Sequence, residues 1–179
     1  MSNASREIRR RVGQDALVED FWREFDVAVG RWRLGELRVE RLPDAAMHAL
    51  LAGCETPSLA QLAAMAGSGS SEIERLLARV LKERERRLPS KDDAVKAVAD
   101  DLVRQMVEGE ISPEQAVERL LIVSMKALSR PAWKDLGVFH HLALDWEIAE
   151  EAPQYLDELR IEILRQGREL FERGGVRLS

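Results

Sequence analysis

The chain has 179 residues, of which 45% are hydrophobic and 33% charged, and its formal net charge is −5. This balance predicts a buried core under a solvated surface and excludes a disordered or collagen-like chain. The apolar runs are far shorter than the roughly 20 residues that a membrane helix needs, and no apolar signal-peptide core follows the N-terminus. The single cysteine, Cys54, cannot form an internal disulfide, so we expect a cytoplasmic protein without a membrane partner.

Helical periodicity and helix-breaking residues together predict an all-α protein. Residues 5–29 carry an apolar stripe compatible with one long helix. The following stretch, RWRLGELRVE, alternates apolar side chains around Gly35 and Glu36, so residues 31–40 form either a small β-hairpin or a frayed continuation of the helix. Residues 1–90 are therefore predicted to form an N-terminal helical module. The later helices of this module are predicted at 44–52, 58–66 and 70–88.

The second half of the chain has the clearest helical pattern, with four successive apolar stripes. Gly109 is predicted to end one helix, and the stretch GEISPEQ to start the next. In that stretch Ser112 is a predicted N-cap, Pro113 occupies the first helical position and Gln115 the capping-box position. Short links between amphipathic helices favour antiparallel neighbours. Residues 91–179 are therefore predicted to form an antiparallel four-helix bundle.

Residues 57–88 resemble a helix-turn-helix unit. The matching small and apolar residues are Leu59, Leu62, Ala63, Ala66, Gly67, Ile73, Leu76 and Leu77. The resemblance implies two closely crossing helices, the second of which can enter the major groove of DNA. The basic side chains that would contact the DNA backbone are Arg75, Arg79, Lys82 and Arg84. Two glutamates near the start of the second helix, Glu72 and Glu74, would repel phosphate, so DNA binding is the alternative function.

Residues 91–173 resemble the small helical immunity proteins that bacteria make against their own toxins. The resemblance is carried by GEISPEQ at 109–115, by FHHLALDWE at 139–147 and by a charged final helix. It implies an acidic helical face that covers a cationic toxin surface. The positions that match this face are Asp145 and Glu147, followed by Glu150 and Glu151.

Negative charge is concentrated in one segment, because residues 135–159 hold seven acidic side chains and no Lys or Arg. Asp157 and Glu158 fall near the start of the last helix, where the helix dipole favours carboxylates. Asp145 and Glu147 end the preceding helix, where the dipole disfavours them. We expect this acidic face to bind a basic protein partner through complementary charge. Its predicted binding residues are Asp145, Glu147, Glu150, Glu151, Asp157 and Glu158.

No residue set predicts an enzyme, a metal site or a cofactor. His141 and Asp145 share a helical face, but two ligands are fewer than a stable metal site uses. Cys54 and His48 are six residues apart, a spacing that does not place thiol and imidazole on one helical face. The glycine–serine run at 67–71 precedes a helix and could cradle a phosphate, but it lacks the Walker lysine.

The sequence therefore predicts a non-enzymatic protein-binding protein, immunity- or antitoxin-like, whose acidic face binds a basic protein. In the alternative, residues 58–88 contact DNA and the bundle forms a homodimer or senses a ligand. The two functions need surfaces of opposite charge, because phosphate repels carboxylate.

Overall fold

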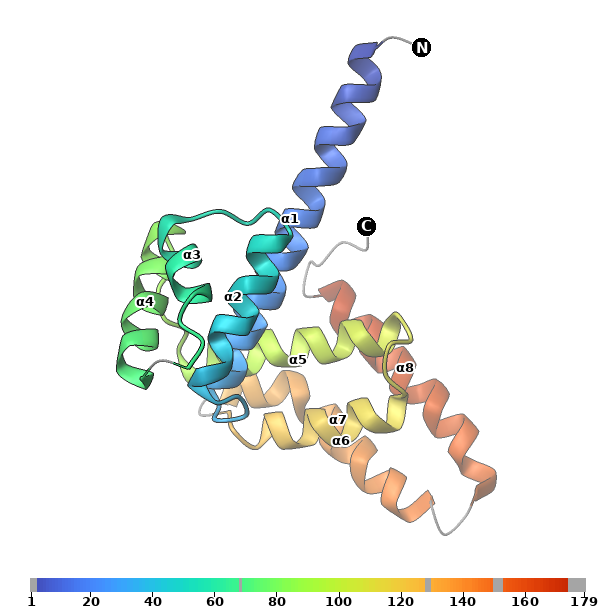
Figure 1. The fold of residues 1–179 in the computed structure, drawn as a ribbon. Coiled ribbons are helices and arrows are strands. Elements are labelled where there is room, and N and C mark those ends of the chain that lie inside the picture. The colour runs from blue at the N-terminus through green and yellow to red at the C-terminus, as the bar shows by residue number, and fades with distance from the viewer. Residues whose placement is uncertain (1–2, 68, 128–129, 150–152, 174–179) are drawn as a thin grey trace. The chain divides into compact units, whose positions relative to one another are not determined.

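The structure, a computed structural model, describes residues 3–67, 69–127, 130–149 and 153–173, and describes side chains from residue 18 onward except at 130–135 and 153. Within these residues the chain forms eight α-helices, two short 3-10 helices and no strand, so the all-α prediction is confirmed (Figure 1). The helices are α1 (Asn3–Arg33), α2 (Leu42–Leu51), α3 (Pro57–Ala63), α4 (Ser70–Glu83), α5 (Lys91–Val107), α6 (Pro113–Ser124), α7 (Arg130–Ala149) and α8 (Leu156–Arg173). The 3-10 helices are η1 (Val39–Arg41) and η2 (Pro153–Tyr155). No helix in the described part of the chain has the length and apolar character that crossing a bilayer requires.

The chain divides into two compact units, Met1–Pro89 and Ser90–Ser179. In the first unit α2 packs against α1 and α3, and α3 packs against α4. Burying each large side chain of its core contributes about 1.5–3 kcal/mol relative to an exposed position. The largest of these buried side chains are Phe25, Val29, Leu42, Leu59, Leu62, Ile73, Leu77 and Val80.

The β-hairpin interpretation of residues 31–40 is wrong. Helix α1 continues to Arg33, and the backbone N–H of Glu36 donates to the carbonyl of Arg31 at 2.8 Å. Gly35 has a φ of +75°, the left-handed conformation that commonly ends a helix. A glycine in this conformation suits a helix end as well as a hairpin turn, which is why the alternating pattern was ambiguous. The chain then enters η1 rather than a strand.

The two helices of the predicted helix-turn-helix unit are present as α3 and α4. Thr56 caps α3, since its Oγ1 accepts the N–H of Leu59 at 3.2 Å. Both helices end earlier than predicted, and α4 ends at Glu83 because Glu85 adopts a left-handed φ of +55°. Ser58 at the start of α3 donates to the Glu83 carboxylate from its backbone N–H at 3.0 Å and from its hydroxyl at 2.5 Å. The first turn of α3 is thereby tied to the last turn of α4.

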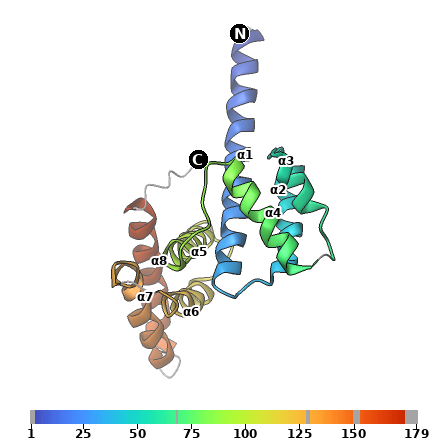
Figure 2. The same cartoon turned by 90° about the vertical axis from the view of Figure 1, so that its left-hand side faces the viewer.

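In the second unit α5 packs against α6 and α8, and α7 packs against α6 and α8 (Figure 2). All four helices contribute to one core, because their apolar stripes face one another. Its largest fully buried side chains are Met106, Leu120, Phe139 and Ile163.

The turn between α5 and α6 confirms the capping prediction. Gly109 has a φ of +78° just after α5, and the N–H of Glu110 donates back to the carbonyl of Gln105 at 2.7 Å. Ser112 and Gln115 form a reciprocal capping box with both hydrogen bonds at 3.3 Å. These bonds satisfy N–H groups at the start of α6 that the helix itself leaves unpaired.

Candidate partner-binding site

The predicted acidic residues lie on two consecutive helices of the second unit. Asp145 and Glu147 fall near the end of α7, and Asp157 and Glu158 occupy the first turn of α8. Glu150 and Glu151 lie outside the described residues. The placement of the four described carboxylates relative to the helix ends therefore agrees with the sequence pattern.

A groove of about 430 Å³ lies between the end of α7 and the start of α8. We call it the α7–α8 groove. Side chains of α7, η2 and α8 line it, and most of them are apolar. The lining residues are Asp145, Ile148, Ala149, Tyr155, Glu158, Leu159 and Glu162. Two predicted binding residues, Asp145 and Glu158, thus meet in one groove although they are separated by a helix boundary.

The carboxylates around the groove differ in their pairing. Glu162 accepts hydrogen bonds from Arg165 at 2.5 Å and from Gln166 at 2.9 Å, and the Arg165 bond is the main reason that its pKa falls to about 2. Asp145 and Glu158 are exposed, and no side chain in the described ranges forms an ion pair with either. The groove therefore contains one neutralised and two unneutralised carboxylates.

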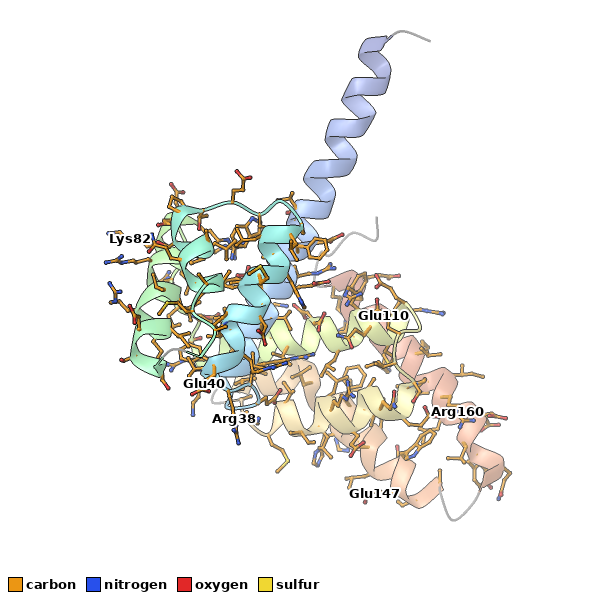
Figure 3. All side chains as sticks on the ribbon, viewed as in Figure 1. Arg38, Glu40, Lys82, Glu110, Glu147 and Arg160 are labelled. Atoms are coloured by element: carbon orange, nitrogen blue, oxygen red, sulfur yellow. The ribbon has the colours of Figure 1, made fainter. Side chains whose placement is uncertain are left out.

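The other two described carboxylates of the acidic segment lie outside this groove. Asp157 is paired with Arg160 at 2.9 Å, one turn along α8. Glu147 is exposed near the end of α7, and it too has no ion pair among the residues that the structure describes (Figure 3). The unpaired carboxylates of the acidic segment in the described ranges are thus Asp145, Glu147 and Glu158. Asp145 and Glu158 share the groove, whereas Glu147, two residues after Asp145, lies on another side of α7.

Large apolar side chains are exposed around the same groove. The exposed fractions are 70% for Ile148 and 57% for Tyr155, both of which line the groove. Single exposed apolar residues are common, but several gathered beside a groove are typical of an interaction site. Sequence analysis missed these residues, because a helical apolar stripe does not show where its neighbours end and solvent begins.

Arg160 of α8 contacts side chains of two neighbouring helices. Its Nε donates to Glu114 of α6 at 2.5 Å, and its guanidinium lies 5.6 Å from the ring centroid of Trp146 of α7. Bonds to Glu114 and Asp157 raise the pKa of Arg160. Partial burial opposes ionisation of Glu114, but bonds from Ser112 and Arg160 outweigh it and lower the pKa of that carboxyl. One arginine therefore connects α8 with both α6 and α7.

The candidate nucleic-acid residues separate into two groups. Arg75, Arg79 and Lys82 are exposed along one side of α4. Of these, Arg75 pairs with Glu72 at 3.3 Å. Arg84 instead lies 11% exposed within the first unit, paired with Asp26 and stacked 3.9 Å from the Trp22 ring centroid. The structure thus leaves three of the four predicted residues on an exposed face.

Comparisons with protein-family models, with curated proteins and with solved structures found no match to this chain. The resemblances to helix-turn-helix units and to immunity proteins therefore stay predictions.

The other candidate reactive groups of the sequence are the Cys54 thiol and a metal site. Cys54 is buried, and its thiol donates to the carbonyl of Val18 at 3.4 Å. Burial raises the pKa of this thiol, and the positive charge of Arg84 offsets only part of the rise. A raised pKa disfavours the nucleophilic thiolate. Among the side chains that the structure describes, no three His, Cys, Asp or Glu residues are grouped to hold a metal ion.

Proposed function

We propose that this chain is a non-enzymatic protein-binding protein, immunity- or antitoxin-like, whose acidic face binds a basic protein partner. The observation that carries the proposal is that Asp145 and Glu158 line a groove with exposed apolar side chains and form no ion pair with a described side chain. Glu147, outside the groove on α7, is likewise exposed without an ion pair in the described ranges. The sequence also predicts Glu150, Glu151 and Asp157 as binding residues, and the proposal includes them.

The charge pattern supports a binding role over a purely structural one. Asp145 and Glu147 lie near the C-terminus of α7, where the helix dipole makes a carboxylate unfavourable by roughly 0.3–1 kcal/mol. Neither carboxylate forms an ion pair with a described side chain that would compensate for this cost. A cationic partner surface would remove it on binding and would also accelerate association by electrostatic steering.

The test is capture of partners from the native lysate by the wild-type chain and by the variant Asp145→Lys/Glu147→Lys. We expect the wild type to retain a basic protein and the variant to lose it. The matched control is Glu118→Lys/Glu172→Lys, which makes the same charge change at two exposed positions outside the acidic face. Recovery of no basic protein, or equal recovery by the wild type and the Asp145 and Glu147 variant, would contradict the proposal.

The exposed basic row of α4 favours a second candidate, a DNA-binding transcriptional regulator. Arg75, Arg79 and Lys82 are spaced so that they follow one helical face, and Arg79 and Lys82 form no ion pair with any described side chain. Phosphate contacts of this kind make binding strongly salt-dependent.

A gel-shift titration of duplex DNA at two salt concentrations tests this candidate. A regulator should bind with an affinity that falls steeply with salt, and Arg79→Glu/Lys82→Glu should abolish binding. Absence of duplex binding at low salt would eliminate the candidate. Retained binding by the variant would show that another surface contacts the DNA.

A further inference from the structure

We propose that the α7–α8 groove receives one arginine of a partner polypeptide together with a large apolar side chain beside it. This inference rests on the proposed function, because it names the chemistry of the partner segment that the acidic face would bind. The partner would therefore present a short basic and apolar segment rather than a diffusely positive surface.

The number and origin of the free carboxylates favour a single forked cation. Asp145 comes from α7 and Glu158 from α8, and both line the groove without an ion pair in the described residues. Glu162 is already engaged by Arg165. A guanidinium carries five N–H donors in a planar fork, so it can donate to two carboxylates at once, whereas an ammonium acts as a compact point charge.

The apolar lining favours arginine over lysine for a second reason. Ile148, Tyr155 and Leu159 would surround the aliphatic stem of the incoming side chain. A guanidinium is more weakly hydrated than an ammonium and stacks on aromatic faces, so it loses less on entering such a groove. Tyr155 is 57% exposed and provides an aromatic face of this kind.

The size of the groove indicates that an apolar side chain accompanies the arginine. At about 430 Å³ the groove is within the range of roughly 300–1,000 Å³ that accommodates drug-sized ligands. The exposed Ile148 and Tyr155, which line the groove, would be covered by such a neighbour. A metal ion is a poorer occupant, because the described side chains contain no group of three or more metal-binding residues.

The experiment is a titration of the full chain with blocked peptides, followed through backbone amide signals by NMR. The probe is acetyl-Ser-Leu-Arg-Phe-Ser-amide, which combines one arginine with apolar neighbours. Comparison peptides replace the arginine by lysine, by the uncharged isostere citrulline, or both apolar residues by serine. We expect the first peptide to shift the signals of Asp145, Ile148 and Glu158, and citrulline to weaken binding roughly ten- to a hundredfold.

Variants of the chain localise the binding. Asp145→Asn/Glu158→Gln and Ile148→Ser should each weaken binding of the arginine peptide about tenfold or more. The matched control is Met125→Ser, which removes an exposed apolar side chain that lies outside the groove and is 74% exposed. Equal binding of the arginine and citrulline peptides, no shift at the groove, or an unchanged affinity of Ile148→Ser would overturn the inference.

The outcome separates this inference from the proposed function. If the peptide fails while the native lysate still yields a basic protein that Asp145→Lys/Glu147→Lys loses, the acidic residues bind the partner but the groove does not receive an arginine with an apolar neighbour, which overturns this inference alone. Sedimentation of the wild type and of Ile148→Ser at matched concentrations identifies the remaining occupant. A dimer that forms only with Ile148 intact would overturn the inference in favour of a second copy of this chain.

Discussion

Arg84 and Asp26 form a two-point ion pair inside the first unit, although 58 residues separate them in the chain. The two guanidinium Nη atoms donate to the two oxygens of Asp26, at 2.6 and 3.1 Å. Only 11% of the Arg84 side chain and 29% of the Asp26 side chain is exposed. The same guanidinium lies over Trp22, so one side chain joins the end of α4 to two positions on α1.

We predict that Arg84→Ala destabilises the first unit by about 2 kcal/mol, because a partly buried carboxylate loses two charge-assisted hydrogen bonds. Amide hydrogen exchange of α1 and α4 in the full chain measures the loss. Arg79→Ala on the exposed face of α4 is the control and should change exchange little. Combining Arg84→Ala with Asp26→Ala should give less than the sum of the single effects, whereas additivity would show that the pair is not coupled.

The left-handed conformation of Gly109 leads to a second prediction. At a φ of +78°, an alanine is strained by its Cβ, so Gly109→Ala should destabilise the second unit by about 1 kcal/mol. Asparagine tolerates this conformation better, so Gly109→Asn should cost less. Urea unfolding followed by circular dichroism gives both values. A Gly109→Ala variant as stable as the wild type would mean that the turn does not require a positive φ.

The Ser58–Glu83 contact predicts a pH effect. Hydrogen bonds from the Ser58 hydroxyl and N–H lower the pKa of Glu83 in the folded chain. A carboxyl whose pKa is lower in the folded chain stabilises the fold at pH values above its ordinary pKa of about 4.3. This stabilisation is lost as the pH falls through the pKa of the folded chain. Ser58→Ala should therefore raise the pKa of Glu83. It should also make the stability of α3 and α4 depend less on pH in the acid range.

Carbon-13 NMR titration of the Glu83 carboxyl measures this shift directly. The control is Ser71→Ala, which removes an exposed hydroxyl in the same unit and should leave the Glu83 titration unchanged. A Glu83 pKa that is the same in Ser58→Ala and in the wild type would contradict the hydrogen-bonded arrangement.

Local signals in the sequence were sufficient for the helices and for their ends in the second unit. Ser112, Gln115 and Gly109 act through neighbours within a few residues, so their roles follow from spacing alone. The two alternatives that the sequence left open at residues 31–40 have the same origin. Gly35 provides a left-handed residue, and the local pattern does not distinguish a helix end from a hairpin turn.

Contacts between residues far apart in the chain could not be predicted from local sequence patterns. Arg84 matched a DNA-contacting position by helical spacing, but its partner Asp26 lies on another helix. For the candidate site, charge counting found Asp145 and Glu158. It could not find the place of Tyr155 in the groove or the contact of Arg160 with Trp146, because both depend on how α7 packs against α8.

The close approach of α8 to α5 at Gly167 gives the last prediction. A Cβ built at Gly167 would overlap the terminal methyl of Met106 and would come within 3.8 Å of Val103 and Val107. Met106 is only 1% exposed, so a branched side chain at Gly167 has no free space. Gly167→Val should therefore destabilise the second unit by about 1–3 kcal/mol through overpacking, as measured by urea unfolding.

Gly167→Ala separates the two effects that act at this position. Alanine gains up to about 1 kcal/mol of helix propensity over glycine, and the atom it meets is the flexible end of Met106 rather than backbone. Its net cost should be smaller than that of valine. Met106→Ala removes the overlapping methyl, so combining it with Gly167→Val should cost less than the sum of the two single changes. Strict additivity would show that the valine is rejected by another neighbour, because only atoms in contact can couple in this way.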